Sequence, residues 1–231
     1  MPVCNGGTVT VGILGGTGPL GSGLALRLAQ AGTAAVIGSR DAERAAEKVA
    51  NLLAPWSGRD LDVSGADNES AAGCDIVVVA TPWEAALETV EPLASRLSGR
   101  LVMSVGNALM KVGREFQAVA PPRGSVALML QSALPKSRLV AACHHLPARE
   151  LLDLDGDLDS DVLVCSDDPD AAATAVRALE VIEGLRPLYA GSLAAAATVE
   201  AFTAVLVSLN VRYKAHTTLK IGGLADRSLP S

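Results

Sequence analysis

Val9–Gly21 reads VTVGILGGTGPLG, an apolar run that leads into a glycine-rich turn, and this stretch decides the fold. Gly16–Gly21 follow the pattern G-x-G-x-x-G, and an apolar helical pattern comes next. In such a turn the first glycine permits a tight bend, the second lets a pyrophosphate approach the backbone, and the third allows close packing of helix and strand. The N–H groups at the start of the helix favour a phosphate. We therefore predict a dinucleotide site that includes Gly16, Thr17, Gly18, Pro19 and Leu20.

The end of the next strand pattern indicates which dinucleotide binds. The apolar run from Ala34 ends at Ser39 and Arg40, and Arg44 follows one helical turn later. NAD sites usually carry Asp or Glu about 20 residues after the glycines, to bind the ribose 2′-OH. A hydroxyl and guanidinium groups instead suit a 2′-phosphate. We predict that Ser39, Arg40 and Arg44 bind NADP(H). A solvated arginine is the alternative, and Asp41 is a candidate cap for the following helix.

Strand and helix patterns alternate along most of the chain. Such alternation builds right-handed βαβ units, so we predict an α/β fold with a Rossmann-type, doubly wound, mostly parallel sheet. The predicted strands are Val9–Leu14, Ala35–Ile37, Leu61–Val63, Ile76–Ala80, Leu101–Ser104, Leu139–Ala142 and Val162–Cys165. The predicted helices between them are Leu20–Ala31, Ala42–Leu53, Glu84–Leu97 and Ala171–Ile182.

The pattern changes after Gly184 to one long helix, roughly Leu193 to Tyr213, and a short tail. We predict an NADP-binding Rossmann domain over residues 1–183 and a small helical domain over 184–231 for substrate binding or dimer contacts. The segment from Leu188 to Leu209 is long enough for a membrane span, but it is rich in Ala, Ser, Thr and Gly and carries Glu200. We therefore predict a buried helix and no membrane partner.

Composition limits the class of protein. The net charge of −6 over 231 residues argues against non-specific nucleic-acid binding. The four cysteines form no C-x-x-C pair, which is typical of reduced thiols, and Cys74 and Cys165 are predicted to be small core residues. The first seven residues lack the basic start and apolar core of a secretory signal. We expect a cytoplasmic protein.

Two further motifs follow predicted strands, where ligands of open α/β sheets bind. Thr81, Pro82 and Trp83 are predicted to line the ribose and nicotinamide half of the cofactor, with a packing role as the alternative for Trp83. His144 and His145 follow a later strand. We favour His144 as a ligand contact, against a purely structural histidine, and no third ligand stands at zinc-like spacing.

The sequence contains no G-x-S-x-G elbow, no H-E-x-x-H motif and no paired carboxylates on one helix face. Hydride transfer explains this lack of a nucleophile and base. It needs two rings held with donor and acceptor carbons about 3–3.5 Å apart and water kept out. We predict catalysis by positioning, with His144 as the one candidate for a direct role.

Taken together, these motifs resemble the NADPH-dependent F420 reductases, also called F420-dependent NADP oxidoreductases. The resemblance covers nearly the whole chain. Its most specific segments are Gly15–Gly18, Gly23–Leu28, Ile37–Arg40, Thr81–Glu84, His144 with Pro147 and Ala148, Val164–Asp168, Gly184–Leu188 and Ala190–Leu193.

The resemblance implies a homodimer that moves a hydride between the nicotinamide C4 of NADP(H) and the C5 of the deazaflavin coenzyme F420. It implies that Thr17–Leu20 cradle the pyrophosphate and that Ala148 lies against the nicotinamide. It also implies that Ser39, Arg40 and Arg44 hold the 2′-phosphate. The apolar walls for the deazaflavin are implied to be Leu146, Pro147 and the tail residue Leu219, beside His144.

Two other functions stay open on the sequence alone. A reductase of a small carbonyl or imine substrate often needs a positioned proton donor, and the last helix offers Glu200 and Tyr213 but no decisive pair. A non-catalytic NADPH-sensing module binds the cofactor without exchanging a hydride. Loss of deazaflavin absorbance on mixing with NADPH separates the main prediction from both alternatives.

Overall fold

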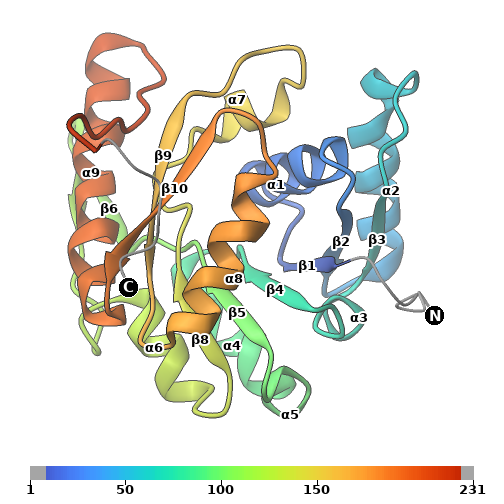
Figure 1. Ribbon diagram of the computed structural model, residues 1–231, viewed down its shortest axis with the longest axis horizontal. Helices are drawn as coiled ribbons and strands as arrows, with labels where there is room; N and C mark the ends of the chain where they lie inside the picture. The colour runs from blue at the N-terminus through green and yellow to red at the C-terminus, as the bar shows by residue number, and fades with distance from the viewer. Residues whose placement is uncertain (1–8, 225–231) are drawn as a thin grey trace.

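Residues 9–224, the part of the chain that the computed structural model describes, build one large sheet with helices on both faces (Figure 1). The strand order is β10-β9-β8-β5-β4-β1-β2-β3, and all neighbouring pairs are parallel except β8 and β9. This order confirms the predicted Rossmann-type, mostly parallel sheet. The strands are β1 Thr10–Leu14, β2 Ala34–Ser39, β3 Val63–Asp67, β4 Ile76–Val79, β5 Leu101–Ser104, β8 Arg138–Ala141, β9 Ser160–Cys165 and β10 Leu185–Gly191.

The helices divide between the two faces of the sheet. They are α1 Pro19–Gln30, α2 Ala42–Leu53, α3 Asn68–Ala71, α4 Ala86–Val90, α5 Ala94–Leu97, α6 Val126–Ala133, α7 Ala148–Leu152, α8 Pro169–Glu180 and α9 Ala196–Tyr213. Successive side chains of a strand point to opposite faces, so Val78 packs with α1, α2, α7 and α8 while Val77 and Val79 pack with α3 to α6 and the start of α9. Each face therefore has its own apolar core.

The antiparallel pairing of β8 and β9 determines which strand ends extend past the ligand-binding edge of the sheet. The two strands meet at Ala141 and Cys165. Because they run in opposite directions from that point, Ser160 and the first residues of β9 extend beyond the carboxyl end of β8. Strand β10 is parallel to β9 and begins at the same level, with Leu185 beside Ser160. The amino ends of β9 and β10 therefore border the edge where the glycine turn lies.

A separate hairpin lies outside the main sheet, alongside the last helix (Figure 1). It consists of β6 Leu109–Val112 and β7 Glu115–Ala118. The Phe116 N–H donates to Ser208 Oγ at 2.9 Å, and Arg212 pairs with Glu115 at 3.1 Å. These contacts fix the hairpin to α9.

Several elements differ from the sequence-based expectation. The predicted helix Glu84–Leu97 is divided into α4 and α5 by a 3-10 turn around Pro92, because proline lacks the N–H that continues a helix. The third strand, predicted at Leu61–Val63, begins at Val63 and ends at Asp67. The hairpin, α3, α6, α7 and β10 were not predicted. Strand β10 follows residue 183 and belongs to the sheet, so the helical part of the C-terminal segment begins after Gly191.

The long last helix was predicted to be buried, and that expectation is only half right. A 3-10 turn, Leu193–Ala195, leads into α9, and Val199 and Glu200 are buried. Phe202, Val205 and Tyr213 are exposed. Within residues 9–224, Leu193–Tyr213 is the one helical segment long and apolar enough to span a membrane by length and composition, with a mean hydropathy of 1.6. One side of α9 therefore exposes apolar side chains that the described part of the chain does not cover.

Candidate active site

The glycine turn lies between the carboxyl end of β1 and the start of α1, as predicted. Gly15, with a φ of +64°, makes the tight bend, and this corrects the assignment of that role to Gly16. Gly16 is needed for packing instead, because a Cβ atom there would lie 2.8 Å from the carbonyl oxygen of Ile13. A Cβ atom at Gly21 would lie 2.7 Å from the Gly16 Cα atom, so the third glycine of the pattern does allow close packing.

Gly18 is the one glycine of the G-x-G-x-x-G pattern that the protein fold itself does not require. Its φ and ψ of −75° and 166° suit any residue, and a Cβ atom there would have no neighbour within 4 Å. Gly18 is also the N-cap of α1 and offers no side-chain oxygen to the first N–H groups, whereas Asp41, Ser125 and Asp168 cap α2, α6 and α8. Open space beside uncapped N–H groups is what a pyrophosphate requires.

The predicted 2′-phosphate residues lie together at the carboxyl end of β2. Ser39 ends the strand, and Arg40 and Arg44 are exposed on either side of the start of α2. Asp41 caps this helix by accepting from the N–H groups of Glu43 and Arg44 at 3.0 and 3.1 Å. Its carboxylate is thus already bound to the helix, and within residues 9–224 neither arginine has an ion-pair partner.

Thr81 lies directly against the glycine turn. A Cβ atom at Gly15 would lie 2.3 Å from Thr81 Cγ2, so the loop after β4 and the turn after β1 touch. Pro82 is exposed, and Trp83 is half-buried and packs partly against the apolar core, as its alternative role predicted. The structure therefore brings the glycine turn and the Thr81–Trp83 motif together.

His144 is held in one orientation by the loop that follows β5. Its Nδ1 atom lies 3.1 Å from the Gly106 carbonyl oxygen, and its own carbonyl accepts from Asn107 Nδ2 at 2.7 Å. A carbonyl only accepts, so the proton of the neutral ring is on Nδ1 and Nε2 carries a lone pair. Burial, and to a smaller extent the neighbouring His145, lower the pKa of His144 to about 4. The ring is neutral at physiological pH.

Six buried polar atoms near the carboxyl ends of three neighbouring strands have no hydrogen-bond partner within the described part of the chain. Ser104 is the last residue of β5, and the other atoms belong to the segments that follow β4, β5 and β8, which are adjacent in the sheet. A buried polar atom without a partner costs about 1–3 kcal/mol, so ligand groups at this edge would relieve a real penalty. The atoms are Thr81 Oγ1, Trp83 Nε1, Ser104 Oγ, Asn107 Oδ1, His144 Nε2 and His145 Nδ1.

The segment implied to contact both rings leads from β8 into α7. Leu146 and Pro147 are buried, and Ala148 is the first residue of α7. The buried Arg27 of α1 holds this helix, because its guanidinium donates to the carbonyl oxygens of Glu150 at 2.8 Å and Asp153 at 2.5 Å. Ala148 is thus anchored to the same helix whose first turn faces the pyrophosphate site.

Leu219, the tail residue implied to be a deazaflavin wall, is half-buried and lies beside β9. Its carbonyl oxygen accepts from the Asp161 N–H at 2.7 Å. The tail also reaches α7, since His216 Nδ1 lies 3.6 Å from Glu150 Oε1. The tail therefore meets both β9 and α7, the helix that continues the loop after β8, at one side of the site.

Sequence reasoning missed two asparagines that support the site. Asn68 Oδ1 accepts from the Gly15 N–H at 3.2 Å and so holds the glycine turn. Asn107 holds the His144 backbone. Both follow strands at the ligand-binding edge, which is a usable signal, but the predicted third strand ends at Val63, well before Asn68.

The three cysteines within residues 9–224 are buried, which favours a packing role for each. Cys74 and Cys165 are buried core residues, as predicted, and Cys143 is fully buried as well. Burial raises the pKa of the Cys143 thiol to about 12, so it stays protonated. Cys4 lies outside the described residues.

Comparisons with known proteins agree with this geometry. Residues 10–108 match the family model for coenzyme F420-dependent NADP oxidoreductases. The chain is 37% identical over 213 residues to the F420-dependent NADP reductase of Methanocaldococcus jannaschii, covering 90% of this chain and 95% of that protein. It is 32% identical to the enzyme of the same name from Methanothermobacter thermautotrophicus, covering 95% of each.

A solved structure shares the fold. A candidate F420-dependent NADP reductase from Arthrobacter sp. FB24 superposes with a TM-score of 0.76. It is 22% identical and covers 94% of this chain and all of its own. At that identity the likeness supports the fold.

Proposed function

This chain belongs to the family of F420-dependent NADP reductases, whose reaction is hydride transfer between NADP(H) and coenzyme F420, and we propose how its residues divide that task. The observation that carries the proposal is the group of unpartnered buried polar atoms beside the open glycine turn. These residues fit a dinucleotide with a second ligand next to it. NADP(H) supplies or accepts the hydride at its nicotinamide ring.

The nucleotide half is assigned to two segments, the glycine turn and the residues from the end of β2 to the start of α2. The backbone N–H groups of Thr17, Gly18 and Leu20 bind the pyrophosphate, because Gly18 leaves space for it and no side chain caps α1. Pro19, which has no N–H, lies between them and starts the helix. Ser39, Arg40 and Arg44 bind the 2′-phosphate through a hydroxyl and two charges that no carboxylate within residues 9–224 neutralises. This charge pattern favours NADP(H) over NAD(H).

In the half of the site where the hydride is transferred, the residues act by positioning the two rings. Thr81, Pro82 and Trp83 line one side of the nicotinamide region, and Ala148 lies against that ring. Leu146, Pro147 and Leu219 supply apolar walls for the deazaflavin and keep water away from the transfer. Because His144 is neutral and its Nδ1 proton is bound to Gly106, it orients a ligand N–H group through Nε2 and donates no proton.

The exposed apolar side of α9 fits a homodimer contact. Val205 and Tyr213 are 51% and 70% exposed, and the neighbouring hairpin exposes Met110 and Val112. If a second copy of the chain covers this surface, the apolar residues that α9 exposes to solvent in one chain are buried in the dimer. We propose the functional division at residue 183: residues 1–183 bind NADP and also supply Leu146 and Pro147 to the deazaflavin site, and residues 184–231 supply the rest of the substrate site and the dimer contact. We also propose a cytoplasmic location.

The dimer proposal is tested by measuring the molecular mass of the protein in solution. Val205→Glu places a charge in the proposed contact, and light scattering after gel filtration is expected to give the mass of one chain. Val181→Glu, which alters an exposed apolar residue at the end of α8, is the control and should keep the dimer mass. A monomeric unaltered protein contradicts the proposal.

The activity is tested by absorbance. Purified protein mixed with NADPH and oxidised F420 should remove the deazaflavin absorbance in a stopped-flow experiment, and NADH should do so far less efficiently. Turnover of a ketone or imine with no change in deazaflavin absorbance contradicts the proposal. Binding of NADPH without hydride exchange would instead support a sensing module.

A further inference from the structure

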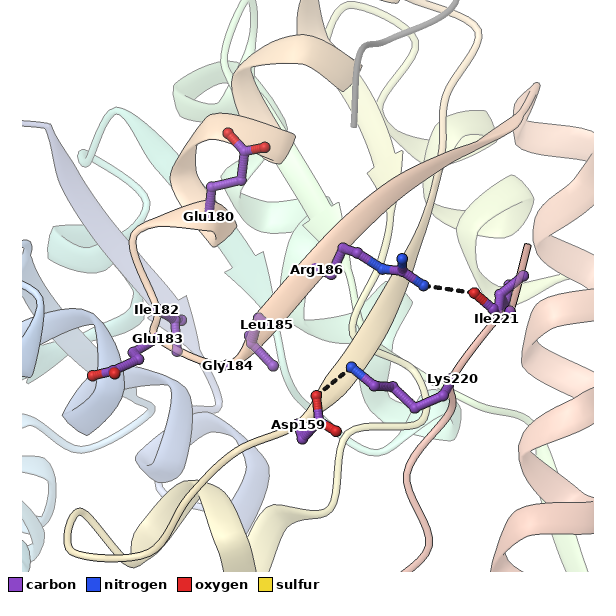
Figure 2. Close-up of a pocket in the computed structure, with 10 residues that line it drawn as sticks. Asp159, Glu180, Ile182, Glu183, Gly184, Leu185, Arg186, Lys220 and Ile221 are labelled. Carbon is purple, nitrogen blue, oxygen red and sulfur yellow. Dashed lines mark hydrogen bonds and ion pairs between the residues drawn. The ribbon is translucent and has the colours of Figure 1, made fainter. Parts of the chain in front are cut away.

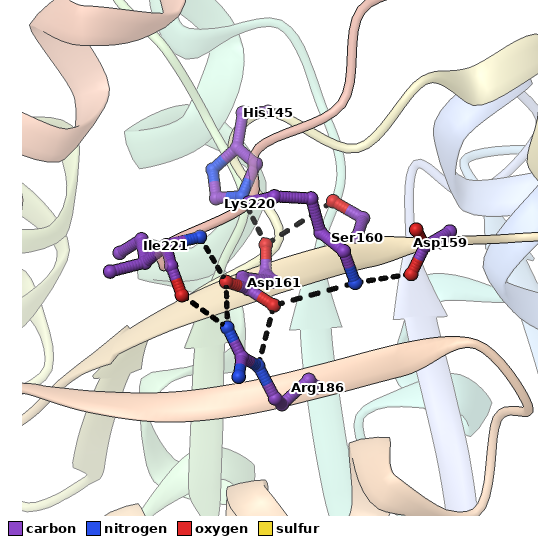
Figure 3. A network of polar contacts seen from close by, with 7 residues as sticks. All are labelled: His145, Asp159, Ser160, Asp161, Arg186, Lys220 and Ile221. Carbon is purple, nitrogen blue, oxygen red and sulfur yellow. Dashed lines mark hydrogen bonds and ion pairs between the residues drawn. The ribbon is translucent and has the colours of Figure 1, made fainter. Parts of the chain in front are cut away.

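The chain after α9 returns to the main sheet as a strap, residues 217–221, which lies beside the amino end of β9 (Figure 3). The Asp161 N–H donates to the Leu219 carbonyl oxygen at 2.7 Å. The Ile221 N–H donates to Asp161 Oδ2 at 2.6 Å, and the Ile221 carbonyl accepts from Arg186 Nη2 at 2.7 Å. Two residues of the sheet therefore hold the strap on both sides of Lys220.

Those two residues form the most buried ion pair of the described structure. The Asp161 side chain is fully buried, and Arg186 on β10 donates to both of its carboxylate oxygens, at 2.7 and 2.5 Å. Burying a carboxylate is costly unless it is paired and fully hydrogen-bonded. The pair and the Ile221 N–H meet that need together, so the strap is part of what satisfies the buried charge.

Asp161 also holds the loop that carries the predicted ring contacts. Its carbonyl oxygen lies 2.7 Å from His145 Nε2 and accepts the proton of that ring. His145 stands between His144 and Leu146 in the sequence. One residue thus connects two segments, the loop after β8 through its carbonyl and the strap through its N–H and carboxylate.

We propose that Asp161 and Arg186 are positioning residues for the deazaflavin, because together they hold the strap and the His144–Ala148 loop at the spacing of the two walls. The proposal rests on the proposed function, in which Leu219 and the loop form those walls. Neither residue touches the reacting atoms in this assignment. The NADP half of the site is held separately, by Asn68 and by the packing of the glycine turn.

The surroundings of the strap on its outer side fit a segment that is held mainly by Asp161 and Arg186. A cavity of about 570 Å³ lies there, lined by Arg186, Lys220 and Ile221 and by three carboxylates, Asp159, Glu180 and Glu183 (Figure 2). Lys220 pairs with Asp159 across its rim. Beside this cavity, the strap is held by its hydrogen bonds to Asp161 and Arg186 and by the ion pairs of Lys220 with Asp159 and Asp161.

The test uses the full-length protein and one measurement that needs no F420. Arg186→Met removes the fork that holds both Asp161 and the strap. Hydrogen exchange, read by mass spectrometry on a peptide that contains Ile221, is expected to be about tenfold faster or more in the variant, because local opening sets the exchange rate. The KM for oxidised F420 should rise about tenfold while the KM for NADPH stays within about twofold, because a displaced wall affects one substrate.

Ile221→Pro is the second variant, since Arg186→Met leaves a buried charge and could impair folding. It removes one strap N–H and keeps the ion pair. Because proline has no amide hydrogen, exchange in this variant is read at the Asp161 amide, which donates to the Leu219 carbonyl oxygen. This exchange should become faster, and the KM for F420 should rise as in Arg186→Met. Arg138→Met is the control: it breaks another two-bond Arg–Asp pair, with Asp168 at the opposite end of β8, and should change neither quantity.

Three results overturn the proposal: unchanged strap exchange in both variants, faster exchange with an unchanged KM for F420, or an equal rise in both KM values. An unaltered protein that binds NADPH but never reduces F420 overturns the proposed function instead. In that case the exchange data still decide whether Asp161 and Arg186 hold the strap.

Discussion

Gly23 of α1 lies against Leu151 of α7, so closely that a Cβ atom on Gly23 would be 2.5 Å from the Cβ atom of Leu151. The same atom would lie 3.4 Å from the Ala148 carbonyl oxygen. Together with the bonds from Arg27 to the α7 segment, this contact makes the dinucleotide helix and the ring-contacting segment one rigid unit. Because Gly23 has no side chain, the two halves of the site can pack directly against each other.

Gly23→Ala tests this link. Replacing glycine by alanine inside a helix usually stabilises a protein by up to about 1 kcal/mol. Here overpacking against Leu151 should exceed that gain and lower the free energy of unfolding by about 1–3 kcal/mol. Urea unfolding measures it, with Gly58→Ala, where a Cβ atom meets nothing, as the control. A stabilised Gly23→Ala protein contradicts the close contact.

Gly18→Ala separates the needs of the ligand from those of the fold. Its backbone angles suit alanine and the space is empty, so the melting temperature without ligand should stay within a few degrees of the unaltered protein. The added methyl group should block the pyrophosphate and abolish most of the rise in melting temperature that saturating NADPH produces.

Gly16→Ala is the matched contrast, because its Cβ atom would lie 2.8 Å from the Ile13 carbonyl oxygen and should lower the melting temperature without any ligand. If Gly18→Ala kept the full response to NADPH, the pyrophosphate would have to bind elsewhere.

Arg40→Ala tests the choice of cofactor. A hydrogen bond between charged groups contributes about 1.5–3 kcal/mol, so losing one at the 2′-phosphate should raise the KM for NADPH about 10- to 100-fold. The KM for NADH, which lacks that phosphate, should change less than about twofold. Lys48→Ala, an exposed cation further along α2, is the control for general loss of charge. Equal changes for both cofactors would refute the assignment.

The elements that the sequence predicted well are those defined by local chemistry. The glycine pattern after an apolar run located β1, the turn and α1, and Ala42–Leu53 was predicted at its observed bounds because Asp41 caps it. The role of Gly15 was missed because a positive φ leaves no mark when several glycines are adjacent.

The elements that were missed depend on contacts distant in sequence. Strand β10 contains Arg186 and Pro187, which do not read as a strand, yet an edge strand tolerates proline and Arg186 is neutralised by Asp161. The connection between Asp161 and His145 is likewise invisible in the sequence. Local patterns therefore predicted the nucleotide half of the site better than the strap side.

Glu200 and His144 oppose one another in the dependence of stability on pH. Glu200 is buried on α9 and accepts from the N–H groups of Val126 and Ala127, at 2.8 and 3.1 Å. Burial raises its pKa from 4.5 to about 7, so the folded protein binds this proton more tightly than the unfolded chain. The proton on Glu200 therefore adds about 3 kcal/mol to the free energy of unfolding below pH 4.5. This contribution is lost as the pH rises through 7.

His144 works in the other direction. Its pKa falls from 6.5 to about 4, so the unfolded chain takes up a proton first and stability falls as the pH drops from 6.5 to 4, again by about 3 kcal/mol. Burial also lowers the pKa of His145, which adds to this loss. The lowered pKa values of Asp67, Asp161 and Asp168 act only below about 4.

Glu200→Gln should therefore make the protein sensitive to acid. Glutamine keeps an acceptor oxygen but does not titrate, so between pH 7 and pH 5 the variant loses stability through the histidines with no opposing gain. Urea unfolding at both pH values measures this: the unaltered protein should change little, and the variant should lose about 1–3 kcal/mol more than it. Parallel changes in the two proteins would mean that Glu200 is ionised at both pH values, and α6 would then be capped by a full negative charge.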